Sequence, residues 1–164
     1  MLRMFLVCLL FAPTSVVHAQ TAPSPVEIAA YEGLHRAAHD GNVEETHRLI
    51  TSGADVNGRD RNGRTPAHVA AFASNDEVLR ALAAARANMN ALDNQAYDIV
   101  TIAAVADDPE LMSLAIELGN NPRLTTSPYR GTALIAAAHL GRVEAVRRLI
   151  AWSPNVVRVS VLTW

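Results

Sequence analysis

Apolar residues along the chain recur at the spacing of one helix face, in short segments separated by polar turns. This pattern predicts helices that cover Val78, Leu79 and Leu82; Leu111, Met112, Ala115 and Ile116; and Val146, Leu149 and Ile150. A second kind of segment is short and rich in alanine, as in GRTPAHVAA at residues 63–71. Thr65 and Pro66 predict the start of its helix, because a Thr hydroxyl accepts a free backbone N–H and Pro is preset for the first helical position.

The two kinds of segment alternate with a fixed period. Residues 34–38 match residues 67–71, and the alanine pairs at 103–104 and 137–138 continue the same step along the chain. The glutamates that precede the second segments keep this step as well: Glu44, Glu77, Glu110 and Glu144. Each unit is predicted to be a short helix, a tight turn, a second helix and a hairpin-like loop. Such a unit cannot bury its own apolar face, so neighbouring units must stack.

The segments DRNGRTPAHVAA and SGADVN closely resemble the ankyrin repeat, whose usual text is Gly-x-Thr-Pro-Leu-His-x-Ala-Ala with a closing Gly-Ala-Asp-Val-Asn. The resemblance implies an all-α solenoid of about four helix-turn-helix repeats with β-hairpin-like loops. The repeats are placed at residues 28–59, 60–92, 93–126 and 127–156. Three units depart from Thr-Pro, but Asp98 and Thr132 keep a capping side chain. His35 and His68 match the motif histidine and are predicted to be structural groups with local hydrogen bonds.

Composition and motifs narrow the classes of function. A net charge of −2 predicts no strong attraction to nucleic acid. The one cysteine, Cys8, lies in the N-terminal segment, and no HExxH, G-x-S-x-G or phosphate-binding glycine loop occurs. We therefore expect no enzyme activity, no cofactor and no metal. The alternative is a metal-binding, small-ligand-binding or enzymatic protein that uses His39 and His139, which are about 30 Å apart if the repeats stack at the usual helix spacing and so cannot share one ion.

The resemblance implies that a partner protein binds the concave side of the stack, where inner helices and loop tips meet. Transferred position by position, the residues after each alanine pair should face this groove: His39, Asp40, Phe72, Ala73, Val105, Ala106, His139 and Leu140. Their identities vary while the scaffold repeats, and apolar side chains among them favour an interaction surface. Tyr and Arg are favoured at hot spots, and the expected loop tips are Arg61, Asn62, Arg64, Asn94, Gln95, Tyr97, Tyr129 and Arg130. The alternative is that these are solvated loop residues without a role.

The two ends of the chain differ from the repeats. Residues 1–19 are typical of an export signal cut after Ala19, which predicts a periplasmic or secreted protein without membrane insertion after cleavage. Residues 20–27 are rich in proline and predict an extended or disordered tether. Residues 157–164 form an atypical tail. Either the sequence is truncated or frameshifted relative to a longer parent, or the tail packs back or mediates self-association.

Overall fold

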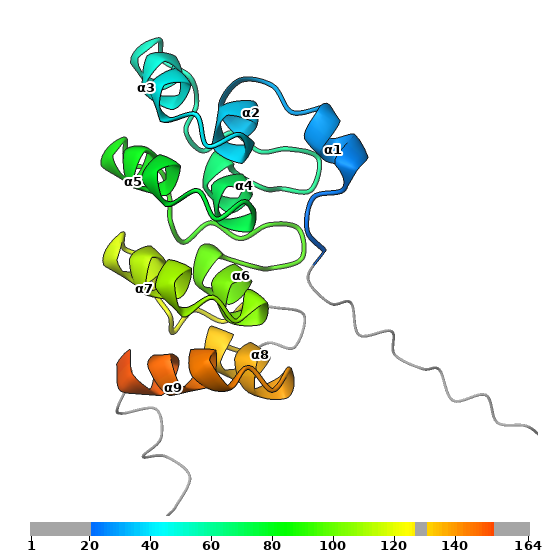
Figure 1. The fold of residues 1–164 in the computed structure, drawn as a ribbon, viewed down its shortest axis with the longest axis vertical. Coiled ribbons are helices and arrows are strands. Elements are labelled where there is room, and N and C mark those ends of the chain that lie inside the picture. Colours follow the sequence, from blue (N-terminus) through cyan, green and yellow to red (C-terminus); the bar gives the residue numbers. More distant parts are fainter. Residues whose placement is uncertain (1–20, 127–130, 153–164) are drawn as a thin grey trace, which may run out of the picture.

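The computed structural model describes residues 21–126 and 131–152, which form a stack of helix pairs preceded by one short helix, α1 (Pro25–Ala29) (Figure 1). The pairs are α2 (Gly33–His39) with α3 (Val43–Thr51), α4 (Pro66–Phe72) with α5 (Asp76–Ala84), α6 (Ile99–Ala106) with α7 (Pro109–Glu117), and α8 (Ala133–His139) with α9 (Val143–Trp152). The first residues of these pairs keep the period that the sequence predicts. The predicted all-α repeat stack is confirmed.

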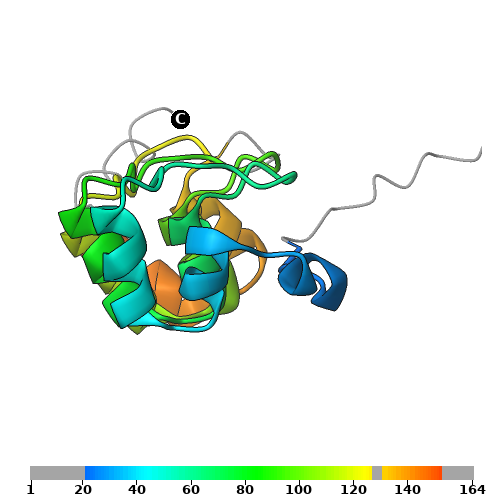
Figure 2. The same cartoon turned by 90° about the horizontal axis from the view of Figure 1, so that it is seen from above.

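The helices form two layers with loops projecting from one edge. Seen from above, the inner helices α2, α4, α6 and α8 form one layer and the outer helices the other, while the connecting loops extend over the inner layer (Figure 2). Inner helices contact the inner helices of neighbouring repeats, and α3–α5 and α7–α9 make the corresponding outer contacts. Each repeat therefore contacts mainly its neighbours in the stack, as in other solenoids.

Helix starts follow the predicted capping residues. Thr65 is the N-cap of α4 with Pro66 in its first turn. Thr132 is the N-cap of α8, but its side chain makes no cap hydrogen bond, so only its position was predicted correctly. Asp98 caps α6 by accepting the backbone N–H of Thr101 at 2.8 Å. A side-chain oxygen that accepts an N–H of the first turn satisfies a donor that has no partner inside the helix. The substitution of Asp98 for the usual Thr therefore preserves the helix start.

The core combines small inner-helix residues with larger side chains from both layers. The alanines Ala38, Ala70, Ala103, Ala104 and Ala137 are all 0% exposed, which confirms that they allow close packing of inner helices. The largest fully buried aliphatic side chains are Leu79, Leu82, Ile99, Ile102 and Met112. These lie in α5, α6 and α7, so the best-packed part of the core is in the middle of the stack.

Two loops form the same hydrogen-bonded hairpin at equivalent positions of successive repeats. The N–H of Asp60 donates to the carbonyl of Arg64 at 2.9 Å, and the N–H of Asp93 donates to the carbonyl of Tyr97 at 2.9 Å. Each aspartate carboxylate also accepts two backbone N–H groups of its own loop at 2.8–2.9 Å. The hairpins are joined to each other, because the N–H of Asn94 donates to the carbonyl of Asn62 at 2.9 Å.

The two motif histidines connect the inner helices α2 and α4 to the hairpin of the next repeat. The Nε2 atom of His35 lies 2.9 Å from the carbonyl oxygen of Arg64, and that of His68 lies 3.1 Å from the carbonyl oxygen of Tyr97. The N–H of Thr65 donates to Nδ1 of His68 at 3.1 Å, so Nε2 carries the proton and donates to Tyr97. A local hydrogen bond was predicted for both histidines, and His68 makes one with Thr65. The bond of His35 is instead to Arg64 of the next repeat, and the contacts to the next repeat were not predicted. In the third repeat, Thr101 replaces the histidine and bonds the Thr126 hydroxyl at 2.6 Å.

The N-terminal part of the described chain corrects one prediction. Residues 25–27 were expected in an extended or disordered tether, but they begin α1. Ser24 is its N-cap and accepts the N–H of Glu27 at 3.3 Å, while the N–H of Ser24 donates to the Glu27 carboxylate at 2.7 Å. This reciprocal capping box, with Pro25 in the first turn, explains why a proline-rich segment forms a helix.

Several predictions concern residues that lie outside the described ranges. These are the export signal at residues 1–19, the loop residues Tyr129 and Arg130, and the tail at residues 157–164. Within the described ranges, no helix has the length and apolar character that crossing a membrane requires.

Candidate functional site

The predicted groove residues lie at one end of the inner helices. They form the last residues or C-caps of those helices: His39 and Asp40 on α2, Phe72 and Ala73 on α4, Val105 and Ala106 on α6, and His139 and Leu140 on α8. Half of them are exposed and the others are half-buried. All eight are therefore at least partly accessible, and one pair occurs in each repeat, while their contact with a partner stays a prediction.

The loop residues divide into accessible and buried positions. Arg61 and Asn94 are exposed, and Asn62 and Gln95 are half-buried. Arg64 and Tyr97 are each 3% exposed, so the expectation that they lie at exposed loop tips is wrong. Both residues close a hairpin, where the chain turns back toward the inner helices. The Tyr97 side chain joins the hydrophobic core, and the Arg64 side chain is covered by the N-terminal segment.

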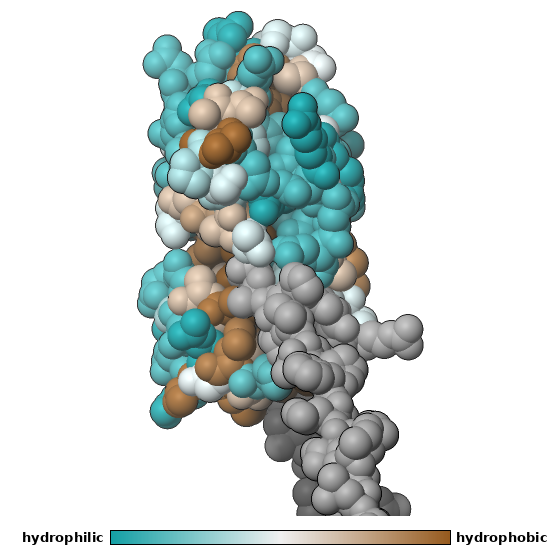
Figure 3. Space-filling model, turned by 90° about the vertical axis from the view of Figure 1, so that its right-hand side faces the viewer, coloured by the Kyte–Doolittle hydropathy of each residue, from teal (hydrophilic) through white to brown (hydrophobic). Residues whose placement is uncertain are grey.

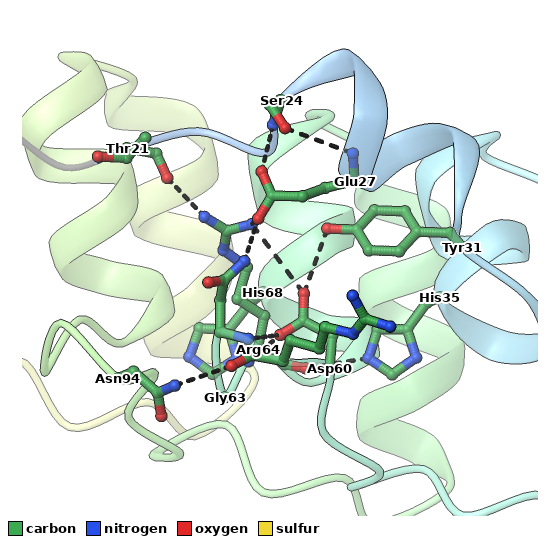
Figure 4. Close-up of polar contacts among 12 residues, drawn as sticks. Thr21, Ser24, Glu27, Tyr31, His35, Asp60, Gly63, Arg64, His68 and Asn94 are labelled. Carbon is green, nitrogen blue, oxygen red and sulfur yellow. Dashed lines mark hydrogen bonds and ion pairs between the residues drawn. The ribbon is translucent and has the colours of Figure 1, made fainter.

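Arg64 is the centre of a polar cluster that the sequence did not predict (Figure 4). Its Nη2 donates to the backbone carbonyl of Thr21 at 2.8 Å, and its Nη1 lies 3.4 Å from Oε1 of Glu27. Its guanidinium carbon lies 5.4 Å from the centre of the Phe72 ring, within the range of a cation–π contact. The cluster therefore joins the second repeat to residues that precede the first.

The carboxylates around Arg64 are arranged to balance its charge only in part. Oδ2 of Asp60 lies 4.0 Å from the guanidinium, at the limit of an ion pair, while Oδ1 of Asp60 accepts backbone N–H groups of the hairpin. The side-chain amide of Asn62 donates to the same Glu27 oxygen that Arg64 approaches. Within the described part of the chain, Nε of Arg64 is buried without a hydrogen-bond partner. Glu27 is thus the carboxylate that makes the closer pair with Arg64.

Hydrogen bonding keeps Glu27 in its charged form. Bonds from Ser24, first through its side chain and then through its backbone N–H, lower the pKa of Glu27 below its usual value, and Arg64 and Asn62 lower it further. Tyr31, which follows α1, donates its hydroxyl to Asp60 at 3.4 Å. Burial raises the pKa of Tyr31, so its hydroxyl stays protonated and available as a donor.

Two cavities border this N-terminal segment, and Glu27 lines both of them. One of about 220 Å³ is lined by four predicted loop residues and by three that sequence reasoning missed: Asn62, Arg64, Asn94 and Gln95 with Thr21, Glu27 and Asp93. The other, of about 530 Å³, is lined by residues of α1 and of the first hairpin, among them Tyr31, His35 and Arg61. The S-x-x-E spacing of Ser24 and Glu27 was the sequence signal that could have indicated an ordered helix here.

The groove histidines lie in separate surroundings. Nδ1 of His39 is 2.9 Å from the Asp40 carboxylate, and the hydrogen bond from His39 is the main cause that lowers the pKa of Asp40. The Tyr31 ring centre lies 6.4 Å from that of His39. His139 is exposed on α8 in the last described repeat. Among residues 21–126 and 131–152, no three His, Cys, Asp or Glu side chains gather in an arrangement that could hold a metal ion.

The loop side of the molecule changes character along the stack. The end that carries the first repeats is mostly hydrophilic, and apolar patches are larger toward the end that carries α8 and α9 (Figure 3). The exposed large apolar residues at that end are Ile135, Leu140, Val143, Ile150 and Trp152. The polar cluster around Arg64 therefore belongs to the hydrophilic end of this side.

A family model described as ankyrin repeats in many copies matches residues 34–82. This chain contains ankyrin repeats. It is 39% identical to the bovine mitochondrial disaggregase over 151 residues, which are 88% of the chain and 21% of that relative. It is 28% identical to the putative ankyrin repeat protein YahD of Escherichia coli K12 over 130 residues, which are 78% of the chain and 64% of that relative. It is 37% identical to the NF-kappa-B inhibitor cactus of Drosophila yakuba over 60 residues, which are 34% of the chain and 12% of that relative.

The chain spans less than two thirds of each of these relatives. The similarity therefore concerns a part of each relative and not the whole protein. Ankyrin repeats generally mediate binding to protein partners, and the family is generally non-catalytic. These general properties agree with a stack that carries accessible, variable side chains at one repeated position.

Proposed function

We propose that the chain is a non-catalytic interaction module that binds a protein partner through the concave groove and loop tips of its ankyrin stack. The observation that carries this proposal is the repeated register of the groove residues. One accessible pair ends each of the four inner helices, and the pairs differ in charge and size while the alanines beneath them stay constant. A rigid row of unlike side chains suits recognition of one particular surface.

The proposal places this module in the cell envelope. Its support is the sequence of residues 1–19, with Arg3 before an apolar stretch and a small-residue site at Ala19. Amino-terminal sequencing of the protein recovered from its native cells tests this. A chain that begins at Gln20 in the periplasmic or secreted fraction supports export, and an intact Met1 in the cytoplasmic fraction overturns it.

Affinity capture with two matched variants tests the groove. The groove variant combines Arg61→Ala, Asn94→Ala, His139→Ala and Leu140→Ala, all at exposed positions. The control variant combines Glu77→Ala, Arg80→Ala, Glu144→Ala and Arg147→Ala, which removes exposed ion pairs from the outer helices α5 and α9. Truncating exposed side chains should leave both variants folded, which circular dichroism and thermal unfolding verify.

The expected result is a partner that the unmodified chain and the control variant both retain and that the groove variant loses. Titration with the purified partner should then give a dissociation constant raised by about tenfold or more for the groove variant, because a few residues carry most of the energy of an interface. Equal affinity of the partner for both variants would place the interface elsewhere. A substrate turned over by the purified chain would contradict the non-catalytic part of the proposal.

A further inference from the structure

The segment before the first repeat occupies part of the surface on which a partner is proposed to dock. Figures 1 and 2 show α1 beside the inner helices α2 and α4 and next to the projecting loops. Thr21 contacts the loop residues Arg64 and Gln95, and Glu27 of α1 contacts the loop residue Asn62. This segment therefore lies on the loop side of the first two repeats.

α1 depends on the stack for its own structure. It has five residues, none of which is buried, and Val26 is 80% exposed. Its apolar contact with the core comes from the half-buried Ile28. Helices this short do not form alone, because the entropy lost when the first turn forms exceeds the stabilisation from its few hydrogen bonds. The helical form of residues 25–29 is therefore a bound conformation, held by the capping box and by contacts with the loops.

The contacts of this segment resemble those of a peptide bound to a receptor. At Thr21 the backbone N–H donates to Oε1 of Gln95 at 3.3 Å, and the carbonyl accepts Nη2 of Arg64 at 2.8 Å. Further along the segment, the Glu27 carboxylate receives the side-chain amide of Asn62 and lies 3.4 Å from Nη1 of Arg64. The loops thus recognise one extended residue through its backbone and one acidic side chain through its charge.

The charge of Arg64 explains why these loops favour an acidic segment. The side chain of Arg64 is 4% exposed, and its closest carboxylate apart from Glu27 is Asp60, at 4.0 Å. A buried guanidinium that is only partly neutralised by its own repeat is stabilised by a further carboxylate with hydrogen bonds. Glu27 supplies that carboxylate from outside the repeats.

We propose that Asp60, Asn62, Arg64, Asn94 and Gln95 form a receptor for an acidic peptide segment of the protein partner, and that residues 21–30 occupy this receptor until such a segment displaces them. The inference rests on the proposed function, since it names the chemistry of the partner at one end of the groove. A tethered occupant acts at a high effective concentration, so it raises the apparent dissociation constant of any competitor.

The test uses a fluorescent peptide with the sequence of residues 21–30, TAPSPVEIAA, and the full-length chain. The peptide should bind the Glu27→Gln chain about tenfold or more tightly than the unmodified chain, because the variant holds its own segment less strongly. A peptide with Gln in place of its glutamate should bind the same variant about tenfold or more weakly. A Glu27→Gln/Arg64→Gln chain should lose the binding, and the exposed outer-helix variant Glu77→Gln should behave as the unmodified chain.

Amide hydrogen exchange of the full-length chain gives a second readout that needs no added peptide. Glu27→Gln should speed exchange in residues 26–30 by about tenfold or more while the amides of α4 and α6 keep their protection. Peptide affinity and exchange rates that are the same in Glu27→Gln and in Glu77→Gln would overturn the proposal.

The outcome is separable from that of the groove experiment. A captured partner whose affinity is unchanged by Glu27→Gln would leave the interaction module in place and overturn the displaceable occupant. Peptide binding with the predicted variant effects, together with no captured partner, would support the receptor and count against the wider groove function.

Discussion

At the scale of single residues, position in the repeat determines the backbone hydrogen bonds of a residue but not the surroundings of its side chain. Arg64 and Tyr97 occupy the same position in successive repeats, and the carbonyl of each accepts the motif histidine of the preceding repeat. The Tyr97 side chain enters the core, whereas that of Arg64 meets Thr21 and Glu27. The sequence motif predicted the shared backbone. The burial of the two side chains depends on residues far along the chain, which no local pattern contains.

His68 should make stability depend on pH. It is 1% exposed, and burial lowers its pKa below the usual 6.5. Below about pH 6.5 the unfolded chain binds a proton that the folded chain does not, so the free energy of unfolding should fall as the pH falls, by at most about 1.4 kcal/mol per pH unit. The stability that the neutral, buried His68 side chain contributes is fully present at pH values above the pKa that this histidine has in the unfolded chain. Chemical denaturation between pH 5 and 8 measures the slope.

Two variants separate this histidine from the other titrating groups. His68→Gln should be less stable than the unmodified chain at pH 8 and should lose part of the slope between pH 6.5 and 5, because its side chain cannot bind a proton. His47→Gln, at an exposed position of α3, should keep the full slope. A slope that is the same in His68→Gln and the unmodified chain would show that His68 does not resist protonation in the folded state.

At the scale of elements, apolar spacing and capping residues were enough to predict the paired helices. The period of the glutamates and alanine pairs locates each helix pair, and the capping role that the sequence predicts for Asp98 is confirmed by its bond from Thr101. The short helix α1 was missed because Pro23 and Pro25 indicated an extended tether. The reciprocal bonds of Ser24 and Glu27, together with the loops beneath them, overcome that composition.

Contact between adjacent hairpins can be tested at Gly63. This residue has a φ of +72°, and a Cβ there would lie 2.9 Å from Cγ and 3.0 Å from the backbone N of Asn94. Gly63→Ala should lower the free energy of unfolding by about 1–2 kcal/mol for the left-handed conformation and by roughly 1–3 kcal/mol more for the crowding. Urea unfolding monitored by circular dichroism measures the loss.

Gly53 is the matched control for this substitution. Its φ is +87°, and an added Cβ would meet no atom within 4 Å among the described residues. Gly53→Ala should therefore cost only the conformational part, about 1–2 kcal/mol. Equal losses at Gly53 and Gly63 would mean that the hairpins separate easily and do not stabilise each other.

At the scale of the whole molecule, large apolar side chains are fully buried in the middle of the stack and less fully buried at its two ends. Its largest fully buried aliphatic residues lie in α5, α6 and α7, while large apolar residues are exposed on α8 and α9. A solenoid repeat gains stability from its neighbours, so a repeat with one neighbour is held less strongly than one with two. The repeat period shows which positions are equivalent, but exposure at a given repeat follows from its place in the stack.

Equivalent leucines of the outer helices provide a test of this gradient. Leu49 and Leu82 occupy the same repeat position in α3 and α5, and Leu82 is 0% exposed whereas Leu49 is half-buried. Leu82→Ala should lower the free energy of unfolding by about 2–5 kcal/mol, because it removes buried methyl groups and leaves a cavity between two neighbours. Leu49→Ala should cost no more than about half as much, because its site is open to solvent on one side. Denaturant unfolding of both variants measures the difference, and equal losses would show that the first repeat is packed as tightly as the second.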